Sequence, residues 1–242
     1  MAGLDLIIGG LGAAARFLPL AWRASWAMLA LTAVATGLAL GQAPVWWLAA
    51  AVLAIVTRGG LWRLALDLGR PGPSGYQLSA IEARLAAVWA LSGLFLAILA
   101  MLTLVVLLCC AYAAASAGLG FNGAEVATWT PAIQGGGRVL LGAAGALGAA
   151  GMVYAAARIS LAEAASVARE KVQVLSAWTL TRRRAFGLAV ANLAVAAPAI
   201  VLWLARGAGW PWLVAESFVI VWLWLPMSIG LMAYAYQAAE KP

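Results

Sequence analysis

Residues 85–117 read LAAVWALSGLFLAILAMLTLVVLLCCAYAAASA, a run of 33 residues without a charged side chain. A helix of this length rises about 50 Å, whereas the hydrocarbon core of a bilayer is about 30 Å thick. The run therefore predicts a transmembrane helix that tilts, bends or extends beyond the membrane.

The composition extends this prediction to the whole chain. Of its 242 residues, 66% are hydrophobic and 10% are charged, whereas soluble domains carry about 25% charged residues. We therefore expect an all-α fold, a polytopic transmembrane helical bundle with amphipathic interfacial helices. Because no polar linker interrupts the sequence, residues 1–242 are expected to form a single membrane domain.

Apolar segments separated by turn residues predict six spans, at about 25–40, 45–66, 85–117, 138–157, 185–205 and 213–237. Residues 1–24 are expected to form a short interfacial helix with a bend at Pro19. The strongest loop signal is Pro71-Gly72-Pro73-Ser74-Gly75. Ser79 and Glu82 have the spacing of a capping box, which predicts a helix start before the third span. A kink is expected at Pro226 in the sixth span.

The distribution of positive charge predicts the orientation. With six spans, both termini and the even-numbered loops share one side of the membrane, and of the 15 Lys and Arg residues only Arg138 and Arg206 fall on the other. Because positive residues collect on the cytoplasmic side, we expect both termini in the cytoplasm, in a bacterial inner (cytoplasmic) membrane. The net charge of +7 is thus interpreted as a topology signal, with no nucleic acid as a partner.

Residues 158–184, RISLAEAASVAREKVQVLSAWTLTRRR, form the most polar stretch and are called the basic segment below. On a helix at about 159–181, an apolar stripe would contain Leu161, Ala165, Ala168, Val172, Leu175 and Thr179, and the opposite face would contain Glu163, Ser166 and Glu170. This pattern predicts a cytoplasmic amphipathic helix resting on the membrane. Glu163 and Glu170 would lie about 10 Å apart along it, which favours a solvated face over a carboxylate pair.

The same segment carries the candidate contacts for anionic lipid or for a partner protein, which are Arg158, Arg169, Lys171, Trp178, Arg182, Arg183 and Arg184. An ordinary topology anchor is an equally weighted alternative. Two candidate intramembrane polar residues lie elsewhere. Asn192 is expected to bridge two helices by a hydrogen bond, with a substrate contact as the alternative. Glu216 is expected to form an interfacial ion pair with Arg206, with a proton site as the alternative.

Small and aromatic residues suggest how the spans pack. Glycines recur at every third position of the fourth span, which predicts close helix association there, at Gly142, Gly145, Gly148 and Gly151. Tryptophans near predicted span ends indicate an aromatic belt, formed by Trp26, Trp46, Trp47, Trp62, Trp129, Trp178, Trp210 and Trp212.

The basic segment carries a resemblance to a known family. Its matching residues, before the surface helix and at the entry to the fifth span, are Arg158, Leu161, Ala177, Trp178, Leu180, Thr181 and Arg182. They resemble a pattern of uncharacterised bacterial six-helix membrane proteins, which include YciC-like proteins and the membrane domain sometimes fused to glycerophosphodiester phosphodiesterases. Arg183 replaces the family's glycine. GGLWRLAL from Gly59 and SAIEARLAAVWAL from Ser79 look like further family segments. The resemblance implies a six-helix fold but no settled activity.

The chemistry of the sequence argues against catalysis. The chain has no histidine, the usual general base at neutral pH. Cys109 and Cys110 are adjacent in an apolar run, so they are interpreted as packing residues, and no metal or cofactor site is expected. We therefore expect a non-enzymatic protein that contacts membrane lipids, with anionic lipids favoured, or a membrane-protein partner, as an accessory or assembly subunit or a homo-oligomer. The alternative is a small transporter or channel for an apolar or lipid-like solute.

Overall fold

A computed structural model describes residues 3–41, 45–69, 77–118, 120–182, 184–205 and 209–240. These described residues form helices and loops without a β-strand. Six of their helical stretches are long and apolar enough to cross a membrane, namely Leu4–Gly41, Val45–Ala65, Ala80–Ser116, Gly136–Ala168, Ala185–Leu204 and Trp210–Glu240. The expected all-α bundle of six spans is confirmed, and the protein is a multi-pass membrane protein.

The chain divides into two compact units, which are described separately. Unit 1 contains Met1–Ala90 and Ala157–Pro242, and unit 2 contains Leu91–Ala156. The single membrane domain expected from the sequence stays a prediction. The expected Pro-Gly loop at 71–75 lies outside the described residues.

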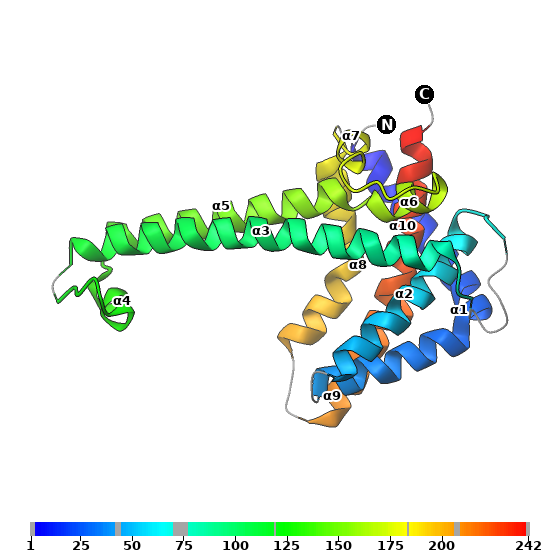
Figure 1. Ribbon diagram of the computed structural model, residues 1–242, viewed down its shortest axis with the longest axis horizontal. Helices are drawn as coiled ribbons and strands as arrows, with labels where there is room; N and C mark the ends of the chain where they lie inside the picture. The colour runs from blue at the N-terminus through cyan, green and yellow to red at the C-terminus, as the bar shows by residue number, and fades with distance from the viewer. Residues whose placement is uncertain are drawn as a thin grey trace. The chain divides into compact units, whose positions relative to one another are not determined.

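Helix α1 (Gly3–Gly41) is the centre of unit 1 and packs against α2 (Val45–Ala65), α8 (Ala185–Leu204), α9 (Trp210–Phe218) and α10 (Leu225–Glu240) (Figure 1). A kink at Ser25 divides α1, so residues 3–24 form a helical segment distinct from the first span, close to the expected bounds of 1–24. That this segment lies at the membrane interface stays a prediction. The expected bend at Pro19 is displaced. The backbone leaves helical geometry at Ser25, with φ −132° and ψ 22°, while Pro19 stays within the helix.

The last span is interrupted by a π-helix, Val219–Trp224, between α9 and α10. Pro226 has no N–H, so it cannot donate the helical bond that the Trp222 carbonyl, four residues earlier, would otherwise accept. The indole Nε1 of Trp22 in α1 donates to this carbonyl at 2.8 Å. At the place where a kink was expected, the helix before Pro226 is a π-helix, and its Trp222 carbonyl accepts a hydrogen bond from α1.

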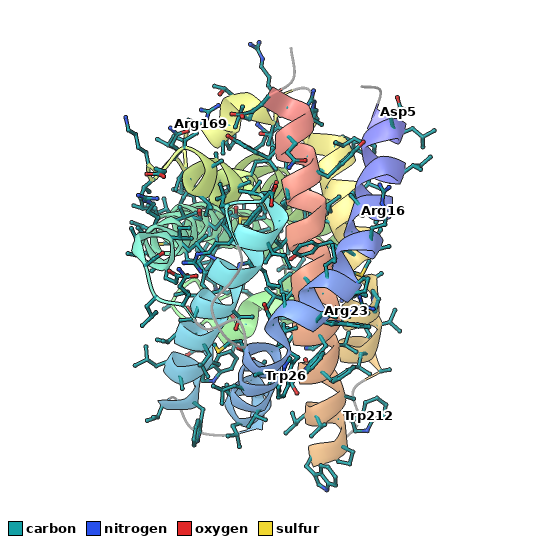
Figure 2. The ribbon with its side chains drawn as sticks, turned by 90° about the vertical axis from the view of Figure 1, so that its right-hand side faces the viewer. Asp5, Arg16, Arg23, Trp26, Arg169 and Trp212 are labelled. Carbon is teal, nitrogen blue, oxygen red and sulfur yellow. The ribbon has the colours of Figure 1, made fainter. Side chains whose placement is uncertain are left out.

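The two ends of unit 1 carry different elements. The start of α1, the end of α10 and the short helices α6 (Ala162–Ala168) and α7 (Ala177–Leu180) lie together, and we call this the α6 end (Figure 1). Arg169 lies at this end and Trp212 of α9 lies at the opposite one (Figure 2).

The predicted amphipathic helix at 159–181 is wrong. Only α6 and α7 are helical, and Glu170 adopts a positive φ of 55°, which ends the helical path between them. The Ser166 hydroxyl accepts a hydrogen bond from the backbone N–H of Gln173 at 2.8 Å, so a side chain replaces a helical bond in this turn.

The predicted apolar stripe is divided in the same way. Leu161 and Ala165 are fully buried, whereas Val172 and Leu175 are 42% and 72% exposed. Ser166, expected on the solvent face, is buried. The segment therefore folds into unit 1 and does not present one continuous apolar face.

Unit 2 is built from the part of α3 (Ala80–Ser116) after Ala90, the short elements Val126–Thr128 and α4 (Trp129–Ala132), and α5 (Gly136–Ile159) up to Ala156. The ring of Tyr112 makes edge contacts with Phe121 and Trp129, with centroids 5.2 and 5.4 Å apart.

The glycine repeat of the fourth span packs at one position. A Cβ at Gly148 would lie 2.5 Å from the side chain of Thr103, so this glycine permits the close approach of α5 to α3. Gly142, Gly145 and Gly151 face open space. The expected helix contact is therefore present at Gly148, and the other three positions face no described atom within 4 Å.

Candidate functional site

A carboxylate on α6 organises the α6 end. Glu163 accepts hydrogen bonds from Arg58 Nε at 3.0 Å and Nη2 at 2.7 Å, from Trp62 Nε1 at 2.8 Å and from Trp89 Nε1 at 2.9 Å. The Arg58 guanidinium also lies over the Trp89 ring, 5.2 Å from its centroid. Arg58 and Trp62 share a face because they are one helical turn apart on α2.

This arrangement corrects the interpretation of Glu163 as part of a solvated face. Its side chain is 15% exposed and that of Arg58 is 13% exposed. A carboxylate has about four lone-pair positions, and the guanidinium and two indoles occupy them. Glu163 is therefore a charged tie between α6, α2 and α3, with no acceptor position left over for acid–base chemistry.

A second carboxylate fixes the start of α3. Glu82 Oε2 accepts the backbone N–H of Ser79 at 2.7 Å, which confirms the reciprocal bond of the predicted capping box. Arg63 Nη2 donates to both oxygens of Glu82, at 2.7 and 2.9 Å, and to the Ser79 hydroxyl at 2.7 Å. A Cβ on Gly59 would overlap the Glu82 carboxylate, so the glycine is required for this close packing.

The end of α10 holds the loop after α6. Glu240 Oε1 accepts Arg169 Nη2 at 3.0 Å and the Tyr236 hydroxyl at 2.6 Å. Arg169 Nη1 also donates to Gln173 at 3.1 Å. The Arg169 and Glu240 side chains are 39% and 45% exposed, so this is a surface pair of small energetic value.

Arg158 is buried inside the unit, and Trp178 is half-buried beside it. Arg158 is 3% exposed, and its guanidinium lies 4.7 Å from the centroid of the Trp178 ring. The Thr181 hydroxyl donates to the Arg158 backbone carbonyl at 2.9 Å. Arg158 therefore supports the packing of the basic segment, and the prediction that it faces lipid is wrong. Trp178 is partly accessible, so its lipid contact stays a prediction.

The remaining predicted contacts do reach the surface. Lys171 and Arg182 are exposed and Arg184 is half-buried. Arg183 lies outside the described residues. Three apolar side chains close to these cations in sequence are also exposed, namely Val172 at 42%, Leu175 at 72% and Phe186 at 81%. We call Lys171, Val172, Leu175, Arg182 and Phe186 together the basic-apolar surface.

Of the two intramembrane candidates, Asn192 has a local role. Asn192 Nδ2 donates to the Leu188 carbonyl of its own helix at 2.8 Å. This bond lies within one helix, whereas a bond between two helices was expected. Glu216 is 5% exposed on α9. Its expected partner Arg206 lies outside the described residues, and that ion pair stays a prediction.

Trp62 was expected in the aromatic belt, but it is 1% exposed and bonds to Glu163. Trp26, Trp47 and Trp210 are exposed, as a belt requires. Among the described residues, no three His, Cys, Asp or Glu side chains are grouped to hold a metal ion.

Comparison with known proteins adds no relative, since no family model, curated protein or solved structure matches the chain. The resemblance to the YciC-like family therefore stays a prediction.

The cluster around Glu163 was not predicted from the sequence. One signal for it was present in the sequence. Arg58 and Trp62 are four residues apart near the end of the second span, so on a helix they share one face. The partner acid is 105 residues away from Arg58, so only the fold identifies it.

Proposed function

We propose that this is a non-enzymatic protein of the bacterial inner membrane whose α6 end faces the cytoplasm and contacts anionic lipid headgroups. The basic-apolar surface would be the contact. The orientation is supported by the charge distribution, since all Lys and Arg residues except Arg138 and Arg206 belong to segments assigned to this side.

The observation that carries the proposal is the exposure of Leu175. Its side chain is 72% exposed in a loop that also exposes Lys171 and Val172. Apolar side chains among cations are typical of surfaces that enter the headgroup region, where the apolar groups reach the acyl boundary and the cations meet phosphate.

The loop is held at both sides, which favours a preformed surface. Glu163 anchors α6 before it, and Thr181 bonds to the Arg158 carbonyl after it. Because its base is fixed, the loop would lose little conformational entropy when it meets the membrane.

The test is the ratio of phosphatidylglycerol to phosphatidylcholine that the purified protein retains from an equimolar mixture. The variant Lys171→Gln/Arg182→Gln is compared with Arg16→Gln/Arg23→Gln, which removes the same charge from exposed positions on α1. Each cation near an anionic surface contributes about 1 kcal/mol. The loop variant should therefore lower the preference for phosphatidylglycerol by about 30-fold.

A much smaller loss is expected in the α1 variant. An equal loss in both variants would mean that only net charge matters, and an unchanged ratio in the loop variant would contradict the proposal. If wild-type protein copurifies with a stoichiometric membrane protein that the loop variant loses, and its lipid ratio is unchanged, the contact is with that partner instead.

A further inference from the structure

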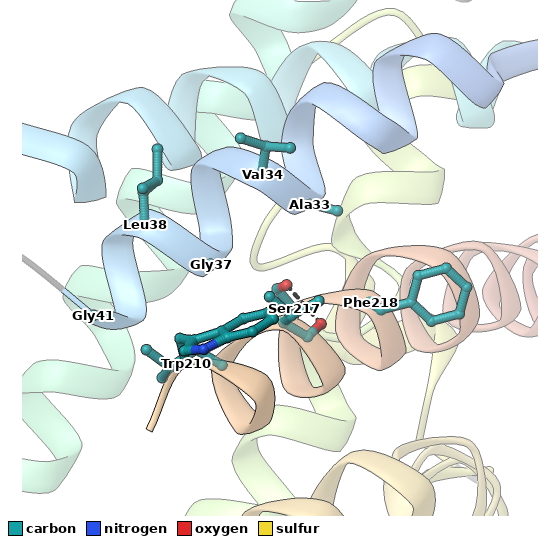
Figure 3. Close-up of a pocket in the computed structure, with 10 residues that line it drawn as sticks. Ala33, Val34, Gly37, Leu38, Gly41, Trp210, Ser217 and Phe218 are labelled. Carbon is teal, nitrogen blue, oxygen red and sulfur yellow. Dashed lines mark hydrogen bonds between the residues drawn. The ribbon is translucent and has the colours of Figure 1, made fainter. Parts of the chain in front are cut away.

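An apolar groove lies between α1 and α9 (Figure 3). Helix α9 is at the end of unit 1 opposite the α6 end (Figure 2). The volume of the groove is about 420 Å³, within the usual range of small-molecule sites, about 300–1,000 Å³. Val34 and Leu38 contribute from α1, and Trp210, Ser217 and Phe218 contribute from α9. Both walls belong to stretches apolar enough to cross a membrane.

The chemistry of the walls indicates what fills the groove. Among the described residues that line the groove, none is charged, and the only side-chain hydroxyl, on Ser217, already donates to the Val214 carbonyl at 3.0 Å. Ordered water needs two or more polar partners, and away from Trp210 the described lining offers one hydroxyl, that of Ser217. An empty apolar space costs free energy in proportion to its volume. Hydrocarbon is therefore the fitting occupant.

The length of the groove matches one leaflet. From Ala33 to Gly41 its α1 wall rises about 12 Å, and one leaflet contributes about 15 Å of hydrocarbon. Gly37 and Gly41 keep the two walls close, since a Cβ at Gly41 would lie 2.9 Å from Leu213 Cδ1 and one at Gly37 would lie 3.3 Å from Ser217 Oγ.

One end of the groove has a polar handle. Trp210 begins α9 and is 74% exposed, and in Figure 3 its indole lies beside the stretch of α1 that carries Gly37 and Gly41. Tryptophan at a membrane interface combines an apolar ring with an N–H donor for headgroup or ester oxygens.

We propose that this groove binds one acyl chain of a phospholipid, with the headgroup at Trp210 and the chain running along Leu38 and Val34 toward Phe218. The bound lipid belongs to the leaflet opposite the α6 end. This site is separate from the basic-apolar surface, and neither proposal depends on the other. Because bulk lipid tails are equally apolar, the preference of a chain for the groove rests on packing contacts.

The test uses phosphatidylcholine with a diazirine on one acyl chain, whose neutral headgroup does not report on the basic surface. After photolysis in nanodiscs, peptide mapping should find adducts enriched in 33–41 and 210–218 over residues 94–108 of α3, which carry many exposed apolar side chains. Equal labelling of groove and α3 would overturn the proposal.

Variants provide the second arm. Val34→Trp/Leu38→Trp fills the groove and should lower groove adducts by about tenfold, whereas Leu31→Trp, at a 51% exposed position of the same helix outside the lining, should not. Each variant is first checked for a monodisperse profile and wild-type helicity. If the double variant fails that check, Leu38→Trp alone is used. Unchanged adducts in a folded filled variant would overturn the site.

Discussion

Arg58 Nη2 donates to both carboxylate oxygens of Glu163, at 2.8 and 2.7 Å, although 105 residues separate the two in sequence. This pair joins α2 to α6 and so determines where the loop that carries Leu175 begins. Charge-assisted bidentate bonds of this kind are among the stronger polar contacts in proteins.

Glu163→Gln should lower the free energy of unfolding by about 2 kcal/mol, since it leaves the Arg58 cation partly buried without its counter-charge. The value is below that of a fully buried pair because both side chains retain some exposure. Reversible unfolding in mixed micelles, monitored by circular dichroism, measures it.

Glu170→Gln is the matched control in the same segment. Glu170 is 79% exposed and lies 3.6 Å from Arg84, so its loss should change stability by less than about 0.5 kcal/mol. Equal destabilisation by the two variants would show that Glu163 is not a structural tie.

Gly59→Ala should destabilise the protein by about 1–3 kcal/mol, because the added methyl group overlaps the Glu82 carboxylate and separates α2 from the start of α3. Gly93→Ala places a methyl group in open space on α3 and should cause no loss. The same unfolding assay compares them. A neutral Gly59→Ala variant would contradict the packing described here.

Trp22→Phe tests the bond to the π-helical segment. Loss of this hydrogen bond should lower the free energy of unfolding by about 0.5–1.5 kcal/mol when Pro226 is present. In a Pro226→Ala background the cost should be smaller, because the substituted alanine restores an N–H for the Trp222 carbonyl. A double-mutant cycle measures the coupling. Strict additivity of the two substitutions would show that the indole does not compensate for the proline.

The proposed orientation predicts which residues are reached from each side. In a Cys109→Ala/Cys110→Ala background, Leu175→Cys should react with a membrane-impermeant maleimide only in inside-out vesicles, and Trp212→Cys only in right-side-out vesicles. The positive-inside bias is the physical reason. Reaction of Leu175→Cys in right-side-out vesicles would invert the assignment.

The sequence predicted the spans well for a physical reason. Runs such as 85–117 must be helical in a bilayer, because every backbone polar group needs a partner within the segment. The second span was expected at 45–66 and is observed at Val45–Ala65, and its last two turns carry Arg58 and Arg63, which pair with Glu163 and Glu82.

The basic segment was mispredicted because its helical periodicity was real but local. Leu161 and Ala165 obey it and are buried. After Arg169 the path is decided by tertiary contacts, including the Ser166–Gln173 and Arg169–Glu240 bonds. The first of these bonds depends on a turn and the second on a residue 71 positions away, so neither leaves a trace in a helical pattern. Tertiary context overrides propensity in short segments.

The depth of Leu175 in the membrane tests the central claim most directly. In the cysteine-free background, a fluorophore at Leu175→Cys is compared with one at Glu170→Cys, five positions earlier and also exposed. In vesicles containing phosphatidylglycerol, a spin-labelled lipid with a shallow nitroxide should quench the Leu175 probe strongly and the Glu170 probe weakly. High salt or neutral lipid should reduce the difference. Equal and weak quenching at both positions, whatever the lipid composition, would contradict contact between this surface and the membrane.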